Sequence, residues 1–145
     1  MDYLLSEMTL KLPDVIEDRS VNVLLFGTKR PPDFNLVISR DYLPKGEKLD
    51  FIVKKQLDVI SAAQKNFKQL GPVRERQVRK RDGSQVTAKE SAVSYKDQGV
   101  KYFQRHLYIP QVGVKILIIV ATVVNVWEKQ DEATWDSVIN SIRLA

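Results

Sequence analysis

The side chains that could do chemistry are few and scattered. The sequence contains a single histidine, His106, and no cysteine. A zinc site or a nucleophilic triad needs several such side chains close together, and the sequence shows no glycine-rich phosphate loop, nucleophile elbow or acidic cluster. We therefore expect no enzymatic activity, no metal and no cofactor, and we interpret His106 as a hydrogen-bonding residue of a binding groove.

Polar groups set within apolar stripes are better candidates for function. Residues 100–109 alternate as a strand does, and one face carries Tyr102, Gln104, His106 and Tyr108. Tyrosine and histidine combine an apolar body with a polar tip, which is typical of binding surfaces. The opposite face is predicted to belong to the core and carries Phe103, Leu107 and Ile109.

Two glutamines fall inside the apolar arc of a long helix predicted over residues 46–70. At 100° per residue, Gln56 and Gln64 share this arc with Leu49, Val53 and Ile60. A buried amide without partners costs about 1–3 kcal/mol, so these side chains need hydrogen bonds. They either bond to neighbouring backbone, or line a mostly apolar groove where they meet polar groups of a bound helix.

Cations cluster between Arg74 and Arg81, within a net charge of +5. Such a cluster is compatible with an anionic partner, so the alternative function is a binding module for nucleic acid or an acidic protein through Arg74–Arg81. Residues 71–94 contain no aromatic side chain that could stack on bases. The cluster also fits an exposed edge hairpin whose charges prevent edge-to-edge pairing. We expect no nucleic-acid partner.

The predicted order of elements is strands, a long helix, a meander of strands and a terminal helix. The strand patterns cover residues 9–12, 21–27, 34–40, 73–80, 86–95, 100–109 and 116–124. Gly71-Pro72 would end the long helix, and Asp131 would begin the last one, whose apolar stripe includes Trp135 and Ile139. This order predicts one α+β domain over residues 1–145, with an antiparallel twisted sheet of about six or seven strands.

The strand predicted at 116–124 is apolar without alternation, so both of its faces have to be covered. If the two helices form one layer, they cover one face of the sheet, and another molecule has to cover the other. Two further strands predict the groove wall. Val21, Val23 and Leu25 share one face of the first, and Asn35, Val37 and Ser39 share one face of the second.

Nothing in the composition indicates a membrane protein. Hydrophobic residues make up 43% and charged residues 28% of the chain, which are ordinary values for a globular domain. The N-terminus lacks the basic start and apolar stretch of a secretion signal. The apolar segment 112–127 is interrupted by Gly113 and Lys115 and is shorter than the ~20 residues of a membrane span. We expect a cytoplasmic protein without stable membrane association.

Short motifs along nearly the whole chain resemble the DcrB-like family, and within it the EagR chaperones that accompany type VI secretion effectors. The N-terminal motifs are residues 12–14 (Leu-Pro-Asp) and 18–23 (Asp-Arg-Ser-Val-Asn-Val). Phe34 and residues 37–41 (Val-Ile-Ser-Arg-Asp) follow. The remaining matches are Gln56-Leu57, Tyr95, Gly99, Tyr108-Ile109 and Trp135.

The resemblance implies a Mog1/PsbP-like fold and a homodimer that forms a cupped apolar surface. This surface would shield the N-terminal transmembrane helices of a secreted effector, for example of the Rhs/PAAR type, before export and without ATP. The implied groove residues, together with those that the strand patterns add, are Val21, Val23, Leu25, Val37, Gln56, Ile60, Gln64, Tyr102, Gln104 and His106.

Overall fold

The computed structural model describes residues 2–4, 9–11, 21–26 and 34–145. Two short strands, β1 (Asp2–Leu4) and β2 (Thr9–Lys11), pair with each other and are not part of the main sheet. The family motifs at residues 12–14 and 18–20 lie outside the described residues.

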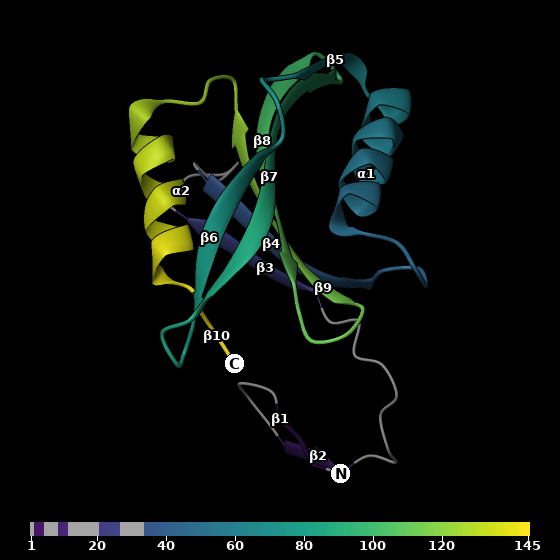
Figure 1. The fold of residues 1–145 in the computed structure, drawn as a ribbon. Coiled ribbons are helices and arrows are strands. Elements are labelled where there is room, and N and C mark those ends of the chain that lie inside the picture. The colour runs from purple at the N-terminus through teal and green to yellow at the C-terminus, as the bar shows by residue number, and fades with distance from the viewer. Residues whose placement is uncertain (1, 5–8, 12–20, 27–33) are drawn as a thin grey trace.

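A sheet of eight strands forms the centre of the described part of the chain (Figure 1). Seven of them follow the order β10-β6-β7-β8-β9-β4-β3, and β5 pairs with β7 beside this path. The strands are β3 (Asn22–Phe26), β4 (Phe34–Tyr42), β5 (Lys65–Gln69), β6 (Arg74–Lys80), β7 (Gln85–Asp97), β8 (Val100–Pro110), β9 (Lys115–Val124) and β10 (Arg143–Leu144).

The sheet is mixed, which corrects the prediction of a purely antiparallel one. All its other strand pairs are antiparallel, but β10 runs parallel to β6, with Arg143 opposite Arg79 and Leu144 opposite Lys80. Two residues after the last helix are too short to be read as a strand from sequence. Leu144 is buried in the core, and this burial explains why so short a segment adds to the sheet.

The two helices lie on opposite faces of the sheet, α1 (Leu49–Ala63) on one and α2 (Lys129–Ser141) on the other (Figure 1). The prediction that they form a single layer was therefore wrong. The physical reason lies in β9, which is apolar on both faces: Ile116 and Ile118 pack in the α1 cluster, while Ile119 packs in the α2 cluster. A strand of this kind needs a cover on each side.

Helix α1 ends at Ala63, seven residues before the predicted end. Gln64 has an extended backbone, and residues from Lys65 onward pair as β5 with the part of β7 that β6 does not reach. Pairing with β5 gives hydrogen-bond partners to the backbone groups at this edge of the sheet. This gain outweighs the helical pattern of the sequence after Ala63. Phe67 and Leu70 consequently lie outside the helix.

The two hairpin turns lie at Asp82-Gly83 and at Gly99, and both are turn signals that the sequence itself shows. Gly83 has φ 88° in the turn between β6 and β7, and Gly99 has φ 78° in the turn between β7 and β8. Glycine adopts these left-handed conformations without steric cost. The turns fix the pairing of β7 with its two neighbours, and so decide which side chains share a face.

Candidate functional site

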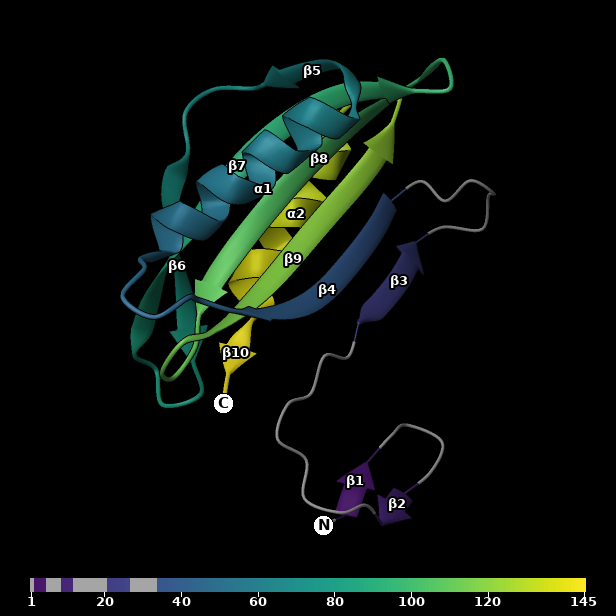
Figure 2. The ribbon, with the colours of Figure 1, turned by 90° about the vertical axis from the view of Figure 1, so that its right-hand side faces the viewer.

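The two faces of the sheet are named by the helix that packs on each, the α1 side and the α2 side. On the α2 side, one core cluster joins α2 to six strands and includes Phe34, Leu107, Ile119, Trp135 and Leu144. On the α1 side, the buried cluster is smaller and consists of Ile52, Val53, Tyr108, Ile116 and Ile118. Helix α1 therefore covers only part of its face: it lies over β7 and β8 and leaves β4, β3 and much of β9 uncovered (Figure 2).

This part of the α1 side carries five of the ten predicted groove residues, in two adjacent rows. The first row crosses the strands through Val23, Val37, Val120 and His106. The second row crosses them through Leu25, Asn35, Thr122 and Gln104. These eight residues define what we call the open face.

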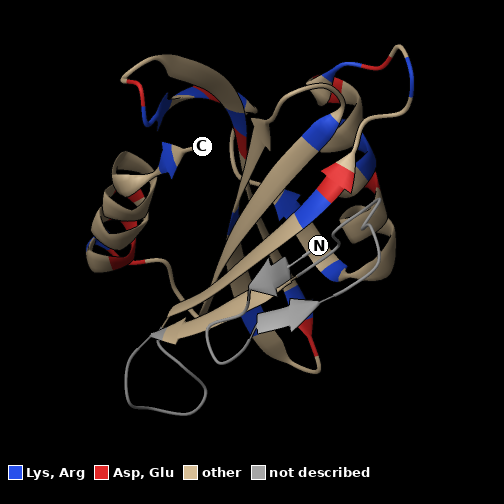
Figure 3. Cartoon of the chain, turned by 90° about the horizontal axis from the view of Figure 1, so that it is seen from below, with Lys and Arg blue, Asp and Glu red and all other residues tan. Residues whose placement is uncertain are grey.

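Exposure on the open face decreases from the sheet edge toward α1. Val23 is 56% exposed and Leu25 45%, whereas Val37 and Val120 are half-buried and His106 is only 4% exposed. Val21, directly before β3, is 58% exposed. The strands that form this face, β3, β4, β8 and β9, carry few charged residues, and those few lie mainly toward the strand ends (Figure 3). The result is a largely uncharged surface whose side chains become more buried toward the helix.

The polar groups on β8 form a closed network instead of pointing outward. Gln104 Nε2 donates to Tyr95 Oη at 3.2 Å and to Thr122 Oγ1 at 3.1 Å, and its Oε1 lies 2.9 Å from His106 Nε2. His106 Nδ1 lies 3.3 Å from Tyr108 Oη. Tyr95 and Tyr102 stack with ring centroids 5.4 Å apart. This network fixes the inner end of the open face.

Burial determines the protonation of the network. Loss of hydration lowers the pKa of His106 to about 4 and raises the pKa of Tyr108 to about 12. His106 is therefore neutral near pH 7. Its expected role as a groove residue that contacts a partner is not supported, because its side chain is buried; it supports Gln104 from below the surface.

Asn35 is the unsatisfied polar group of the open face. Its Oδ1 is buried and has no hydrogen-bond partner, although Thr122 lies opposite it on β9. A buried acceptor without a donor costs about 1–3 kcal/mol, so Asn35 lowers the stability of this face.

The predicted helix residues border the open face. Gln56 and Ile60 are half-buried, on the same arc of α1 as the buried Ile52 and Val53, and Gln64 is half-buried directly after the helix. In the described part of the chain, the side chains of Gln56 and Gln64 form no hydrogen bond. The interpretation that they bond to neighbouring backbone is thus wrong for the side chains, and their amides remain open to a bound molecule.

The α2 side holds a buried polar network that the sequence did not reveal. Glu90, 2% exposed, accepts hydrogen bonds from Arg74 Nε, from Arg76 Nη1 at 3.1 Å and from Trp135 Nε1 at 2.9 Å. Arg76 also pairs with Asp136 at 3.1 Å. The available signal was an acidic residue on the core side of β7, between Ala88 and Ala92.

This network changes the interpretation of the basic cluster. Arg74 and Arg76 hold Glu90 and thereby fix α2 on the sheet. The carboxylate raises the pKa of Arg74 through their hydrogen bond. Consequently, residues 74–81 are not one continuous surface for an anionic partner, as the alternative function assumed.

Neither a metal site nor a membrane span is found in the described ranges. No group of three or more histidine, aspartate or glutamate side chains there could hold a metal ion. No helix in the same ranges has both the length and the apolar character needed to cross a membrane.

Comparison with known proteins agrees with the motifs. A crystal structure of PA94 from Pseudomonas aeruginosa, described as a protein of unknown function and a candidate regulator, shares the fold with a TM-score of 0.71 at 20% identity. The match covers 100% of this chain and 96% of that chain. No curated protein matches. The family model of DcrB matches residues 7–141, and the chain therefore belongs to the DcrB family.

Proposed function

We propose that the protein is a cytoplasmic, ATP-independent chaperone of the EagR type, which shields the N-terminal transmembrane helices of a type VI secretion effector. The observation that carries this proposal is the open face: apolar side chains on three strands beside α1 that the protein's own helix does not cover. The resemblance of the sequence motifs to EagR chaperones supplies the class of client.

The open face suits an apolar helix physically. A transmembrane helix exposes about 20 apolar residues, and burying apolar surface is favourable by about 25 cal/mol per Å². Val23 and Leu25 are exposed at the edge, and Val37 lies between them and α1. A helix laid along these strands would be held against α1, in contact with Ile60.

Polar groups around the open face favour a client with matching groups. Gln56 and Gln64 offer half-buried amides without internal partners. A transmembrane helix with a serine or threonine hydroxyl, or with an unsatisfied N–H at a helix end, would satisfy these amides. Such contacts set the register of the client, while apolar burial supplies most of the affinity.

Dimer formation and release complete the proposal. Two copies would double the apolar surface available to a client that carries more than one helix, and the resemblance implies such a homodimer. Transfer of the client to another apolar environment is sufficient for release. No catalytic step and no nucleotide is then required, so the dissociation rate of the complex is expected to be the same with and without ATP.

The decisive experiment co-expresses the protein with the N-terminal apolar segment of an effector encoded by a neighbouring gene. Ile60→Asp places a charge beside the open face and is expected to abolish co-purification. Val59→Asp is the matched control. It places an aspartate on the same helix one residue away, at a side chain that is 59% exposed. If both variants still bind the segment, the open face is not the binding site and the proposal is refuted. Thermal unfolding of each variant checks that it is folded.

A further inference from the structure

A second surface lies at the other end of the sheet, where the β6–β7 hairpin meets β10. Arg79 and Arg143 are paired positions on the parallel strands β6 and β10, so their Cα atoms are about 4.8 Å apart. Their strand neighbours Val78 and Leu144 are buried in the core. Both arginines therefore project from the opposite side of this edge, and both are exposed.

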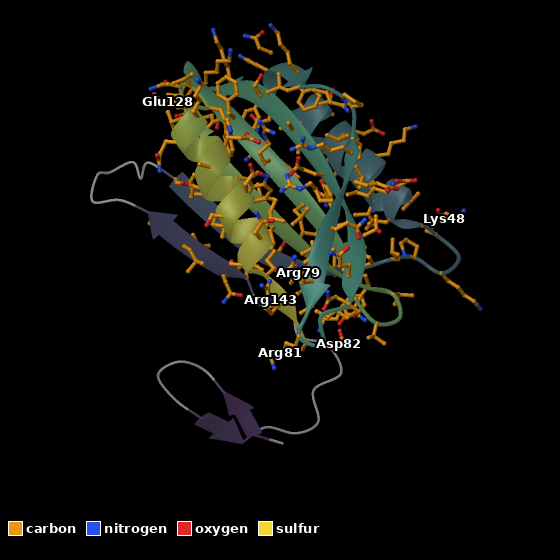
Figure 4. The ribbon with its side chains drawn as sticks, turned by 60° about the vertical axis from the view of Figure 1, so that its left-hand side comes forward. Lys48, Arg79, Arg81, Asp82, Glu128 and Arg143 are labelled. Carbon is orange, nitrogen blue, oxygen red and sulfur yellow. The ribbon has the colours of Figure 1, made fainter. Side chains whose placement is uncertain are left out.

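Arg81 joins this pair at the start of the hairpin turn, and its backbone N–H donates to Leu144 O at 2.8 Å. Figure 4 shows Arg79, Arg81 and Arg143 gathered at this end of the sheet, close to Asp82. Residues 79–81 and residue 143 are far apart in sequence, so only the β10–β6 pairing reveals the cluster.

These three guanidinium groups differ from the other arginines nearby in having no acidic partner. On the same strand, Arg74 and Arg76 are held by Glu90. In the described part of the chain, no ion pair involves Arg79, Arg81 or Arg143. Arg143 Nη1 donates only to the backbone oxygens of Asn140 and Ile142, at 2.9 and 2.7 Å.

Among the described residues, the carboxylate of Asp82 in the hairpin forms no ion pair with these arginines. Asp82 Oδ1 accepts hydrogen bonds from Ser84 N at 2.8 Å and from Ser84 Oγ at 2.6 Å. These bonds close the turn and lower the pKa of Asp82. Asp82 keeps its negative charge and offsets part of the cluster, but the three guanidinium groups leave a net positive charge at this end of the sheet, which solvent or an anionic partner screens.

We propose that Arg79, Arg81 and Arg143 form a docking surface for an acidic segment of a partner protein. Guanidinium groups bind carboxylates through paired hydrogen bonds.

The surroundings favour a protein over a nucleic acid. Binding of single-stranded nucleic acid relies on aromatic side chains that stack on the bases, and neither residues 71–94 nor residues 136–145 contain one. The surface is separate from the open face, so a protein could hold a client and a second partner at once. This gives the protein the two contacts that an adaptor needs.

The test uses fluorescence anisotropy with two labelled probes of equal charge: a peptide with a run of aspartate and glutamate, and oligo-deoxythymidine. The full-length chain is expected to bind the peptide more tightly, with an affinity that falls as NaCl is raised. The triple variant R79Q/R81Q/R143Q is expected to bind the peptide about tenfold more weakly or worse.

A variant with the same loss of charge at exposed lysines elsewhere, K45Q/K54Q/K55Q, is the matched control and is expected to bind within about twofold of the wild type. Equal losses in both triple variants would show a net-charge effect and overturn the proposal. Tighter binding of the oligonucleotide, or no peptide binding at low salt, would overturn it too. I60D, which blocks the open face, is expected to leave peptide binding unchanged, so the two proposals fail independently.

Discussion

The α2 side and the α1 side of one sheet are built in contrasting ways. On the α2 side, apolar residues from six strands meet Trp135 and Ile139, and the buried Glu90 has three hydrogen-bond donors. On the α1 side, the helix leaves two rows of side chains partly uncovered, with an unsatisfied acceptor at Asn35. The contrast separates a face with a large packed core from a face that leaves apolar side chains uncovered, and under the proposed function the second face binds the client.

The largest expected effect is on the α2 side. Trp135→Ala removes a fully buried indole and leaves Glu90 without one of its donors. We expect a loss of about 3–5 kcal/mol in the free energy of unfolding, measured by urea denaturation. Trp135→Phe is the control and should lose less, because the ring volume is largely kept. A loss below about 1 kcal/mol for Trp135→Ala would contradict the view that this face carries the stability.

The next effect is a loss of stability at low pH, and it comes from His106, which lies beneath the open face. Burial lowers the pKa of His106 to about 4 in the folded protein, whereas an unfolded histidine titrates near 6.5. As the pH falls from 6.5 to 4, the unfolded state takes up a proton that the folded state does not, so stability is lost. The expected contribution is on the order of 3 kcal/mol.

This prediction is checked by urea denaturation of the wild type and His106→Gln at pH 7 and pH 4.5. The wild type should lose more stability between the two pH values than the variant does. Equal losses would show that His106 is not held neutral in the folded protein.

A smaller effect is expected when Glu90 loses its charge but keeps its shape. Glu90→Gln weakens the bonds from Arg74 and Arg76, and we expect a destabilisation of about 1–3 kcal/mol. Glu75→Gln is the matched control on β6, since Glu75 pairs with Lys89 at 3.1 Å in an exposed position. Its effect should stay below about 1 kcal/mol. Equal effects would contradict the expectation that the buried ion pairs of Glu90 contribute more to stability than the exposed pair of Glu75.

The smallest effect on stability is expected on the open face. The double variant Val23→Ser/Leu25→Ser changes two side chains that are about half exposed, so the free energy of unfolding should change by less than about 1 kcal/mol. Retention of an apolar client segment should nevertheless decrease, as measured by co-purification. A variant that is strongly destabilised, or that binds as the wild type does, would argue against the assignment of binding to this face.

Sequence periodicity was sufficient to predict which side chains share a face of a strand. Alternation in β4 placed Phe34 and Leu36 in the core and Asn35 and Val37 on the opposite face, which the structure confirms. The β6–β7 and β7–β8 hairpins were predictable because Asp82-Gly83 and Gly99 are strong turn signals. Local patterns of two or three residues carry this information, so no knowledge of distant contacts was needed.

Features that depend on distant contacts were not predictable. The end of α1 is set by the free edge of β7, and β10 exists because Leu144 reaches the core. The helical pattern alone could not show that α1 and α2 take opposite faces. The burial of His106 was missed for the same reason, since alternation gives its face but not the cover above it. The Mog1/PsbP-like assignment stays a prediction.

Strand β3 has a consequence for how such a protein is produced. It is the last strand of the sheet, no described strand pairs with its outer edge, and its residues from Asn22 to Phe26 include no charged side chain. Edge strands without charges or proline readily pair with other chains. Synthesis in excess over its binding partners should therefore lead to concentration-dependent precipitation, so matched expression levels would protect the cell from insoluble material.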